Sequence, residues 1–256
     1  MIISIITITY NDFEELNKTL RTIPVSNILE SVIVNGGECK ETIKYLKTYP
    51  GKVIKGKDEG ISDAFNKGLK HSSGKYVMFL NSGDELVKKE YISSSINILD
   101  KNPRYSFVHS NLIFIDKSGT ELFMRPPLKN VGRGMPYLHP TMIVRKEVFD
   151  KIGGFKKEIK ISMDYDWIVR LDKEGYIGYY LDQDAPVRMD GGGKSVVREG
   201  EAIRECYKIL KENDYLNFKN FKGYIVRYFL YFFRSLMNAI KLDSLLLALK
   251  KMKHSR

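Results

Sequence analysis

The stretch from Tyr76 to Glu85, YVMFLNSGDE, joins a short apolar run to a polar and acidic end. Five apolar residues in succession are typical of a strand that is buried on both faces. The residues that follow favour a turn, because Asn, Ser, Gly and Asp are common turn formers. They also suit a binding site, because open α/β sheets bind ligands beyond the carboxyl ends of their strands. On its own, the stretch leaves both interpretations open.

Strand and helix patterns alternate through the first hundred residues. Apolar and β-branched runs predict strands at residues 2–9, 29–34, 52–55 and 75–80. Apolar residues at helical spacing predict helices at residues 12–23, 40–49 and 61–71. This alternation predicts right-handed crossovers and a parallel α/β sheet. Polar residues that follow three of the strands would then lie along one edge of the sheet, at 9–11, 35–37 and 81–85.

The pattern changes after Asp100. Apolar runs predict a meander of strands at 105–115 and 120–124, and a loop rich in Pro and Gly follows at 125–140. Helices are predicted at 146–152 and about 163–174, and a last strand at 176–181. The chain shows no internal repeat and no low-complexity linker.

Length and composition indicate a globular α/β protein. The 256 residues suffice for one large domain with an appended segment, and 43% hydrophobic with 29% charged residues is ordinary for a soluble protein. The first residues lack a basic region and a cleavage site, so they predict a buried strand rather than a signal peptide. Cys39 and Cys206 lie far apart and in no metal-ligand spacing, which argues against a structural disulfide or zinc site and fits a reducing compartment.

The basic charge of the chain is concentrated in its last segment. Residues 218–256 hold nine Lys or Arg and one Asp, so this segment carries +8 of the net charge of +11. A nucleic-acid surface usually spreads its basic groups over the folded domain, so we expect no nucleic-acid partner.

The same segment has the pattern of an amphipathic helix. Aromatic and aliphatic residues share one face of the predicted helix: Phe218, Phe221, Ile225, Phe229, Phe232, Leu236 and Ile240. Arg227, Arg234 and Lys241 lie opposite and interrupt every apolar run well below the ~20 residues that a membrane span needs. This pattern predicts a helix that lies on an anionic membrane surface. The alternative is a helix packed on the rest of the chain or on a second subunit.

Common nucleotide and hydrolase motifs are absent. The sequence has no Walker phosphate loop, no G-x-G-x-x-G after the first strand and no G-x-S-x-G elbow. What remains is a set of acidic residues: Asp58, Asp63, Asp84, Asp164 and Asp166. Magnesium and manganese usually take one or two carboxylates together with substrate phosphates. Asp84, beyond a predicted strand end, is well placed for that role.

Several ordered motifs resemble those of the inverting glycosyltransferases of family two. They are TITYN at 7–11, VNGG at 34–37, DEGISDAFNKG at 58–68, LNSGD at 80–84, HPT at 139–141, GGF at 153–155 and DYDWIVRL at 164–171. The resemblance covers roughly the first two hundred residues, and motifs that agree in order are more specific than any one of them. It implies the GT-A fold, a Rossmann-like nucleotide-binding sheet with helices on both faces, and transfer of a sugar from a nucleotide diphosphate.

The resemblance also implies roles for two of the acidic residues. Asp84 stands where family members carry the metal-contacting acid, so it would hold Mn²⁺ or Mg²⁺ against the diphosphate of a UDP- or GDP-type donor. Asp164 matches the catalytic base, which takes a proton from the acceptor hydroxyl as that oxygen attacks the anomeric carbon. The product would have inverted configuration.

Further site residues follow from the same motifs. Donor-binding candidates are Thr9, Tyr10, Asn11, Asn35, Asp58, Asp63, Asn66, Ser82, Gly83 and Lys194, the last in a glycine-rich run that starts at Asp190. Acceptor-binding candidates are His139 and Asp166. Simpler roles stay open for several of them: helix capping for Asp58 and Asp63, complementing the helix dipole for Asp166, a structural role for His139 and a surface loop around Lys194. Many family members carry Asp at the positions of Asn35 and Gly83, which leaves Asp84 as the main acid.

Together these features predict a two-part chain. Residues 1–213 form the GT-A domain, with a donor half at 1–100 and an acceptor half at 101–213, and residues 214–256 form the basic helical tail. We expect a metal-dependent transferase at the cytoplasmic face of the plasma membrane, a homo-oligomer being one option. It would extend a polyisoprenoid-linked or soluble glycan for a surface polysaccharide. The alternatives are a noncatalytic nucleotide- or glycan-binding module, a membrane-docked scaffold and, with less support, a nucleotidyltransferase.

Overall fold

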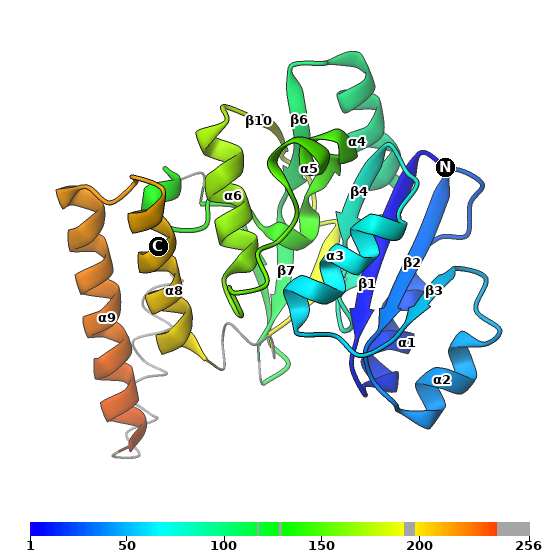
Figure 1. Ribbon diagram of the computed structural model, residues 1–256, viewed down its shortest axis with the longest axis horizontal. Coiled ribbons are helices and arrows are strands. Elements are labelled where there is room, and N and C mark those ends of the chain that lie inside the picture. Colours follow the sequence, from blue (N-terminus) through cyan, green and yellow to red (C-terminus); the bar gives the residue numbers. More distant parts are fainter. Residues whose placement is uncertain (117, 128–129, 192–197, 240–256) are drawn as a thin grey trace.

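A seven-stranded sheet forms the centre of the protein (Figure 1). The computed structural model describes residues 1–116, 118–127, 130–191 and 198–239. In spatial order the strands are β3 (Lys52–Lys55), β2 (Leu29–Asn35), β1 (Ile3–Thr9), β4 (Tyr76–Phe79), β9 (Ile143–Arg145), β6 (Tyr105–Ser110) and β10 (Ile177–Leu181). Neighbouring strands are parallel except at β9, which runs antiparallel to β4 and β6.

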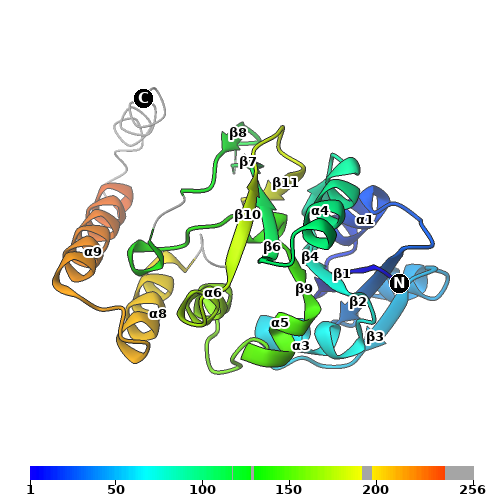
Figure 2. The same cartoon turned by 90° about the horizontal axis from the view of Figure 1, so that it is seen from above.

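Helices cover both faces of this sheet (Figure 2). One face carries α1 (Phe13–Thr22), α2 (Lys40–Leu46) and α4 (Glu90–Lys101), and the other carries α3 (Ile61–His71), α5 (Lys146–Ile152) and α6 (Met163–Lys173). Side chains of β4 alternate between the two layers, since Tyr76 and Met78 join one apolar core and Val77 and Phe79 the other. A strand buried on both faces is what the apolar run at 76–80 predicts.

A second, four-stranded sheet joins the two halves of the chain. Its order is β5 (Glu85–Leu86), β11 (Val187–Asp190), β7 (Leu112–Ile115) and β8 (Glu121–Met124). Strand β11 pairs antiparallel with β5, with Arg188 opposite Glu85. This pairing brings the end of β11 to the acidic turn that follows β4.

Most of the predicted helices and strands are present in the structure, and some of the predictions are wrong. The strands and helices of the first 80 residues are confirmed within a few residues at each end. The predicted meander is wrong, because β6 and β7 flank Asn111 and enter different sheets, and only β7 and β8 form a hairpin. The Pro- and Gly-rich loop contains two 3-10 helices, η1 (Val131–Arg133) and η2 (His139–Thr141).

Two helices stand beside α6 at the end of the molecule farthest from β3 (Figures 1 and 2). They are α8 (Glu199–Glu212) and α9 (Phe218–Ala239). Gly200 contacts Tyr231 and Tyr207 lies 6.4 Å from Tyr224 between ring centroids, so the two helices run antiparallel. Within the described ranges, α9 included, the structure has no helix with the length and hydropathy of a membrane span.

Candidate functional site

The ends of β1, β2 and β4 lie together. The backbone N–H of Gly36 donates to the Thr9 carbonyl at 3.1 Å, and that of Ser82 donates to the Ile8 carbonyl at 3.4 Å. Asn11 has a positive φ of 53°, and its Oδ1 accepts from the backbone N–H groups of Glu38 and Cys39 at 2.7 and 3.0 Å. The polar residues after β1 therefore hold the loop after β2 in place.

The side chains at this edge differ in their availability to a ligand. Asn35 is 3% exposed, and its Oδ1 accepts from the Gly37 N–H at 3.1 Å, which closes the turn after β2. Thr9 is also buried. Tyr10 is 71% exposed, so its ring is open to a planar ligand.

Asp58 and Asp63 lie at the start of α3, and both pair with Lys67 of that helix. Lys67 Nζ lies 2.6 Å from Asp58 Oδ1 and 3.0 Å from Asp63 Oδ2, and Lys157 Nζ lies 2.6 Å from Asp63 Oδ1. The hydrogen bond from Lys157 holds the pKa of Asp63 well below its usual range, although burial acts against it. Asp58 reaches the strand-end edge, where its carboxylate would collide with any side chain at Gly36. Asp58 is thus closer than Asp63 to a ligand at that edge.

Asn66 is occupied by contacts within the protein. Its Nδ2 donates to the Phe155 carbonyl at 2.7 Å, and its Oδ1 accepts from the Phe155 N–H at 2.9 Å. These two bonds join α3 to the loop after α5. Donor binding by Asn66 would require their loss.

Asp84 is buried in the turn after β4. It is 4% exposed, its Oδ2 accepts from the Asn81 N–H at 3.2 Å, and the carboxylate also accepts from the backbone N–H of Asp190. Burial raises the pKa of Asp84 to about 7 against the effect of these hydrogen bonds, and the Asp190 carboxylate raises it further. No local pattern in the sequence predicts that Asp190 lies beside Asp84, because β11 meets β5 only in the folded chain.

The atoms around Asp84 fit a hard divalent cation. Asn81 Oδ1, Ser82 Oγ and Glu15 Oε2 are buried and have no hydrogen-bond partner in the part of the chain that the structure describes. Carboxylate, amide and hydroxyl oxygens suit Mg²⁺ or Mn²⁺. Over the same residues, no group of three or more His, Cys, Asp or Glu side chains is arranged to hold a metal. The protein would therefore supply few ligands, and substrate phosphates or water would supply the rest.

Asp164 lies in the first turn of α6 beside His139 of η2. Burial raises the pKa of Asp164, and the neighbouring His139 acts against that shift. Burial also lowers the pKa of His139, so the imidazole tends to stay neutral. The His139 ring stacks on Phe79 at the end of β4, with 5.6 Å between centroids. The geometry sets a carboxylate of increased basicity next to the end of the central strand.

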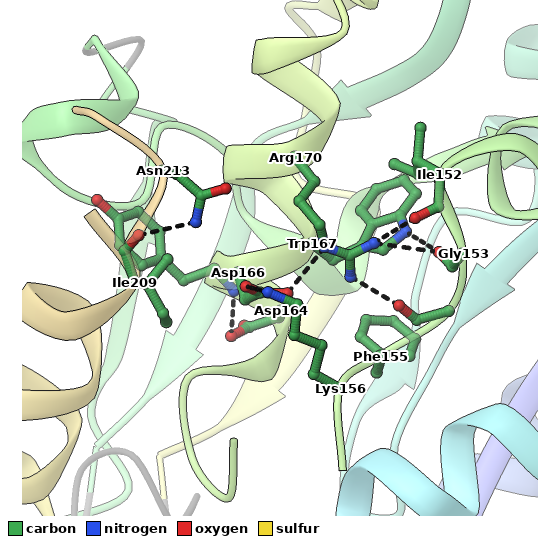
Figure 3. Close-up of polar contacts among 12 residues, drawn as sticks. Ile152, Gly153, Phe155, Lys156, Asp164, Asp166, Trp167, Arg170, Ile209 and Asn213 are labelled. Carbon is green, nitrogen blue, oxygen red and sulfur yellow. Dashed lines mark hydrogen bonds and ion pairs between the residues drawn. The ribbon is translucent and has the colours of Figure 1, made fainter. Parts of the chain in front are cut away.

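Asp166 points into the protein and is fully buried (Figure 3). Its Oδ1 lies 2.9 Å from Lys156 Nζ, and its Oδ2 lies 2.9 Å from Arg170 Nε. Arg170 also donates to the carbonyls of Ile152 and Gly154, at 2.5 and 2.7 Å. Both carboxylate oxygens are thus engaged in holding α6 to the glycine loop after α5, so we assign Asp166 a structural role in place of acceptor binding.

Glu205 of α8 is a site residue that sequence reasoning missed. Its carboxylate accepts from the backbone N–H groups of Lys160, Ile161 and Ser162 at 2.9, 3.0 and 2.8 Å. These residues immediately precede α6, so Glu205 fixes the entry to the helix that carries Asp164. No motif marks Glu205, because its partners are backbone groups more than forty positions away.

Helix α9 also reaches the neighbourhood of Asp164. The Tyr165 hydroxyl donates to the Val131 carbonyl at 2.5 Å and lies 3.3 Å from the Tyr224 hydroxyl of α9. Lys194, the remaining donor-binding candidate, lies outside the described residues.

Comparisons with known proteins agree on one family. The sequence profile of Glycosyl transferase family 2 matches residues 4–156. An uncharacterized glycosyltransferase of Mycobacterium tuberculosis is 25% identical over 183 residues, which cover 66% of this chain and 68% of that protein. Another, of Rickettsia prowazekii, is 28% identical over 152 residues, covering 54% of this chain and 48% of that protein.

Solved structures share the fold. S. aureus TarS in complex with UDP-GlcNAc superposes with a TM-score of 0.64 at 19% identity, over 82% of this chain and 66% of that one. The mannosyltransferase PcManGT from Pyrobaculum calidifontis, in complex with GDP-Man and Mn²⁺, gives 0.62 at 14% identity, over 80% of this chain and 63% of that one. This chain therefore spans just under two thirds of each of those chains. The likeness confirms the predicted α/β fold of the GT-A type.

Proposed function

Because this chain belongs to glycosyltransferase family 2, we propose that it moves a sugar from a nucleotide-diphosphate donor to a hydroxyl of a glycan acceptor, with inversion at the anomeric carbon. One relationship carries the proposal. Among the Asp and Glu side chains that the structure describes, those with raised pKa values are Asp84 and Asp164, and both are linked to the end of β4. Asp84 lies in the turn that follows this strand, and Asp164 lies beside His139, which stacks on Phe79.

The donor would bind along the ends of β1, β2 and β4. Exposed Tyr10 and Asp58, which lies against Gly36, would flank the base and ribose, and Asp84 would lie on the side of the diphosphate. The solved relatives bind UDP-GlcNAc and GDP-Man, which supports a UDP- or GDP-type donor here. When bound at Asp84, Mn²⁺ or Mg²⁺ would neutralise charge on the leaving diphosphate. A bound cation would favour the ionised carboxylate and would therefore lower the raised pKa of Asp84.

The acceptor would bind on the side of Asp164. This carboxylate takes the proton of the acceptor hydroxyl while the oxygen forms its bond to the anomeric carbon and the bond to the nucleotide diphosphate breaks. Attack from the face opposite the leaving group inverts the configuration. The half-buried position of Asp164 supports the proposal, because a carboxyl of raised pKa is a better base near neutral pH.

We further propose that the protein works at the cytoplasmic face of the plasma membrane, on a lipid-linked glycan for a surface polysaccharide. Large apolar side chains of α9 support this location, among them Phe229, which is 66% exposed, and Val226, which is 57% exposed. The charge of +8 over residues 218–256 would attract anionic lipid.

Thermal stabilisation by nucleotides tests the proposal. UDP or GDP with Mn²⁺ should raise the melting temperature of the wild-type protein, because a ligand that binds only the folded state stabilises it. Asp84→Ala should lose the Mn²⁺-dependent part of this shift, whereas Glu59→Ala, at a side chain 73% exposed, should keep it. The absence of any nucleotide shift would count against the transferase and favour a glycan-binding module or a scaffold.

A further inference from the structure

An apolar groove runs between α8 and α9. It measures about 590 Å³, and its walls are almost wholly carbon. Tyr207 lies on the α8 side, and Ile225, Phe229 and Phe232 lie on the α9 side. These α9 positions belong to the apolar stripe that predicts a membrane-surface helix, so at least part of that stripe faces the groove.

The adjacent flank of α9, about a quarter turn from the groove residues, is apolar as well. Val226, Leu230 and Phe233 do not line the groove, yet their side chains are 57%, 49% and 40% exposed. A helix with apolar residues on more than one face is typical of burial in protein or in a membrane. Exposed apolar side chains thus lie next to the groove, where they could contact the hydrocarbon of a bilayer.

A positively charged side chain, that of Arg204, lines the groove. Among the described residues that line it, Arg204 is the one with a charged side chain. The nearby carboxylate of Glu201 forms its hydrogen bonds with Arg198 and interacts with Arg204 only through the attraction between their charges. Arg204 therefore suits an anionic group attached to an apolar chain.

The groove is connected to the proposed base. Tyr224 lines the groove, and its hydroxyl lies 3.3 Å from that of Tyr165, the residue after Asp164. Arg204 precedes Glu205, whose carboxylate holds the backbone at the entry to α6. A ligand in the groove would therefore lie against the elements that position Asp164.

We infer that this groove binds the hydrocarbon chain of the acceptor, with the lipid phosphate at Arg204. This inference rests on the proposed transferase function, and it selects a prenyl-diphosphate-linked acceptor over a soluble glycan. A chain without hydrogen-bonding groups fits walls that offer few of them, whereas the groove would leave many polar groups of a glycan or peptide unsatisfied.

Calorimetric titration with geranylgeranyl diphosphate tests the inference. EDTA is present so that the diphosphate cannot bind through a metal at Asp84. Phe229→Asp changes a groove residue, and Leu230→Asp makes the matched change on the next residue, outside the groove. We expect wild type and Leu230→Asp to bind geranylgeranyl diphosphate with equal affinity, and Phe229→Asp to bind it at least about tenfold more weakly. Arg204→Gln should weaken the binding of geranylgeranyl diphosphate but not the binding of geranylgeraniol.

Several outcomes would overturn the inference. Equal losses in Phe229→Asp and Leu230→Asp would indicate a general lipid surface, and equal affinity for inorganic diphosphate would indicate a phosphate site without a chain subsite. A wild-type dimer that Phe229→Asp dissociates would show that a second copy fills the groove. Nucleotide stabilisation, measured on the same samples, separates the two proposals. If nucleotides still stabilise the protein while geranylgeranyl diphosphate fails to bind, the assignment of the groove is wrong and the proposed transferase function stands.

Discussion

Glu205 accepts a hydrogen bond from the backbone N–H of Ser162 at 2.8 Å. This bond, with two more to the residues just before, connects α8 to the start of α6. Asp164 follows Ser162 by two residues, so the position of the proposed base depends on a helix near the carboxyl end of the described chain. Helix α8 therefore supports the helix that carries the proposed base.

Replacing Glu205 should change both stability and the pH profile of transfer. Glu205→Ala leaves three backbone donors without their acceptor, which should lower the free energy of unfolding by about 1–3 kcal/mol and reduce kcat. The Glu205 charge also contributes to raising the pKa of Asp164. Both Glu205→Ala and Glu205→Gln should therefore move the acid limb of the pH–rate profile to lower pH. An unchanged limb in both variants would contradict this role.

Asp84 should make the metal-free protein less stable as the pH rises. Its pKa is raised from 3.8 to about 7, so between these values the folded state holds a proton that the unfolded state has released. Stability from this group is thus present below about pH 4, falls up to about pH 7 and stays low above it. Melting temperatures from pH 4 to 8 should show this decline in wild type and not in Asp84→Asn.

The same melting temperatures should be measured with Mn²⁺ present. A bound cation favours the ionised carboxylate, so Mn²⁺ should stabilise the wild-type protein more at pH 8 than at pH 5. The same pH slope in wild type and Asp84→Asn would show that Asp84 ionises normally.

Local sequence patterns predicted those helices and strands whose formation depends on residues close together in the chain. The first four strands and three helices follow from apolar spacing, because each crossover joins strands that are close in the chain. Strand β9 has three residues and exists because it fits between β4 and β6. Helix α8 likewise was not predicted, although Ile209 and Leu210 bury its apolar face.

The candidate site was predictable to a similar extent. The family resemblance identified Asp84 and Asp164, because each of them lies in a motif of consecutive residues. It could not show that Asp190 lies beside Asp84 or that Glu205 supports α6, because tertiary pairing creates both contacts. It also gave Asp166 an acceptor role, whereas the structure surrounds that carboxylate with Lys156 and Arg170.

Asp166→Ala should destabilise the fold. Removing this carboxylate leaves Arg170, whose side chain is 16% exposed, without its charge partner. Loss of one partner from a buried ion pair costs about 3–5 kcal/mol. Urea denaturation should show a decrease of that size. A near-normal unfolding midpoint together with a raised KM for the acceptor would instead support acceptor binding by Asp166.

Gly83→Asp should not restore the acid that many family members carry at this position. Gly83 has a φ of +98°, which L-residues rarely adopt, and an added Cβ would lie 3.0 Å from Glu15 Oε2. We expect a loss of about 1–3 kcal/mol in unfolding free energy and no gain in Mn²⁺ affinity. Tighter Mn²⁺ binding at unchanged stability would show that this turn accommodates a paired acid.

Asp164→Asn tests whether Asp164 is the base that deprotonates the acceptor. The measurement is the turnover of a donor sugar that the protein accepts, alongside the Kd of the nucleotide, with Asp150→Asn at an exposed position as the matched control. Because a general base acts on the reacting proton, we expect Asp164→Asn to lower kcat by about 10²–10⁴-fold and to leave the nucleotide Kd within about twofold. Transfer at the wild-type rate, or an equal loss of nucleotide binding, would contradict the assignment of Asp164 as the base.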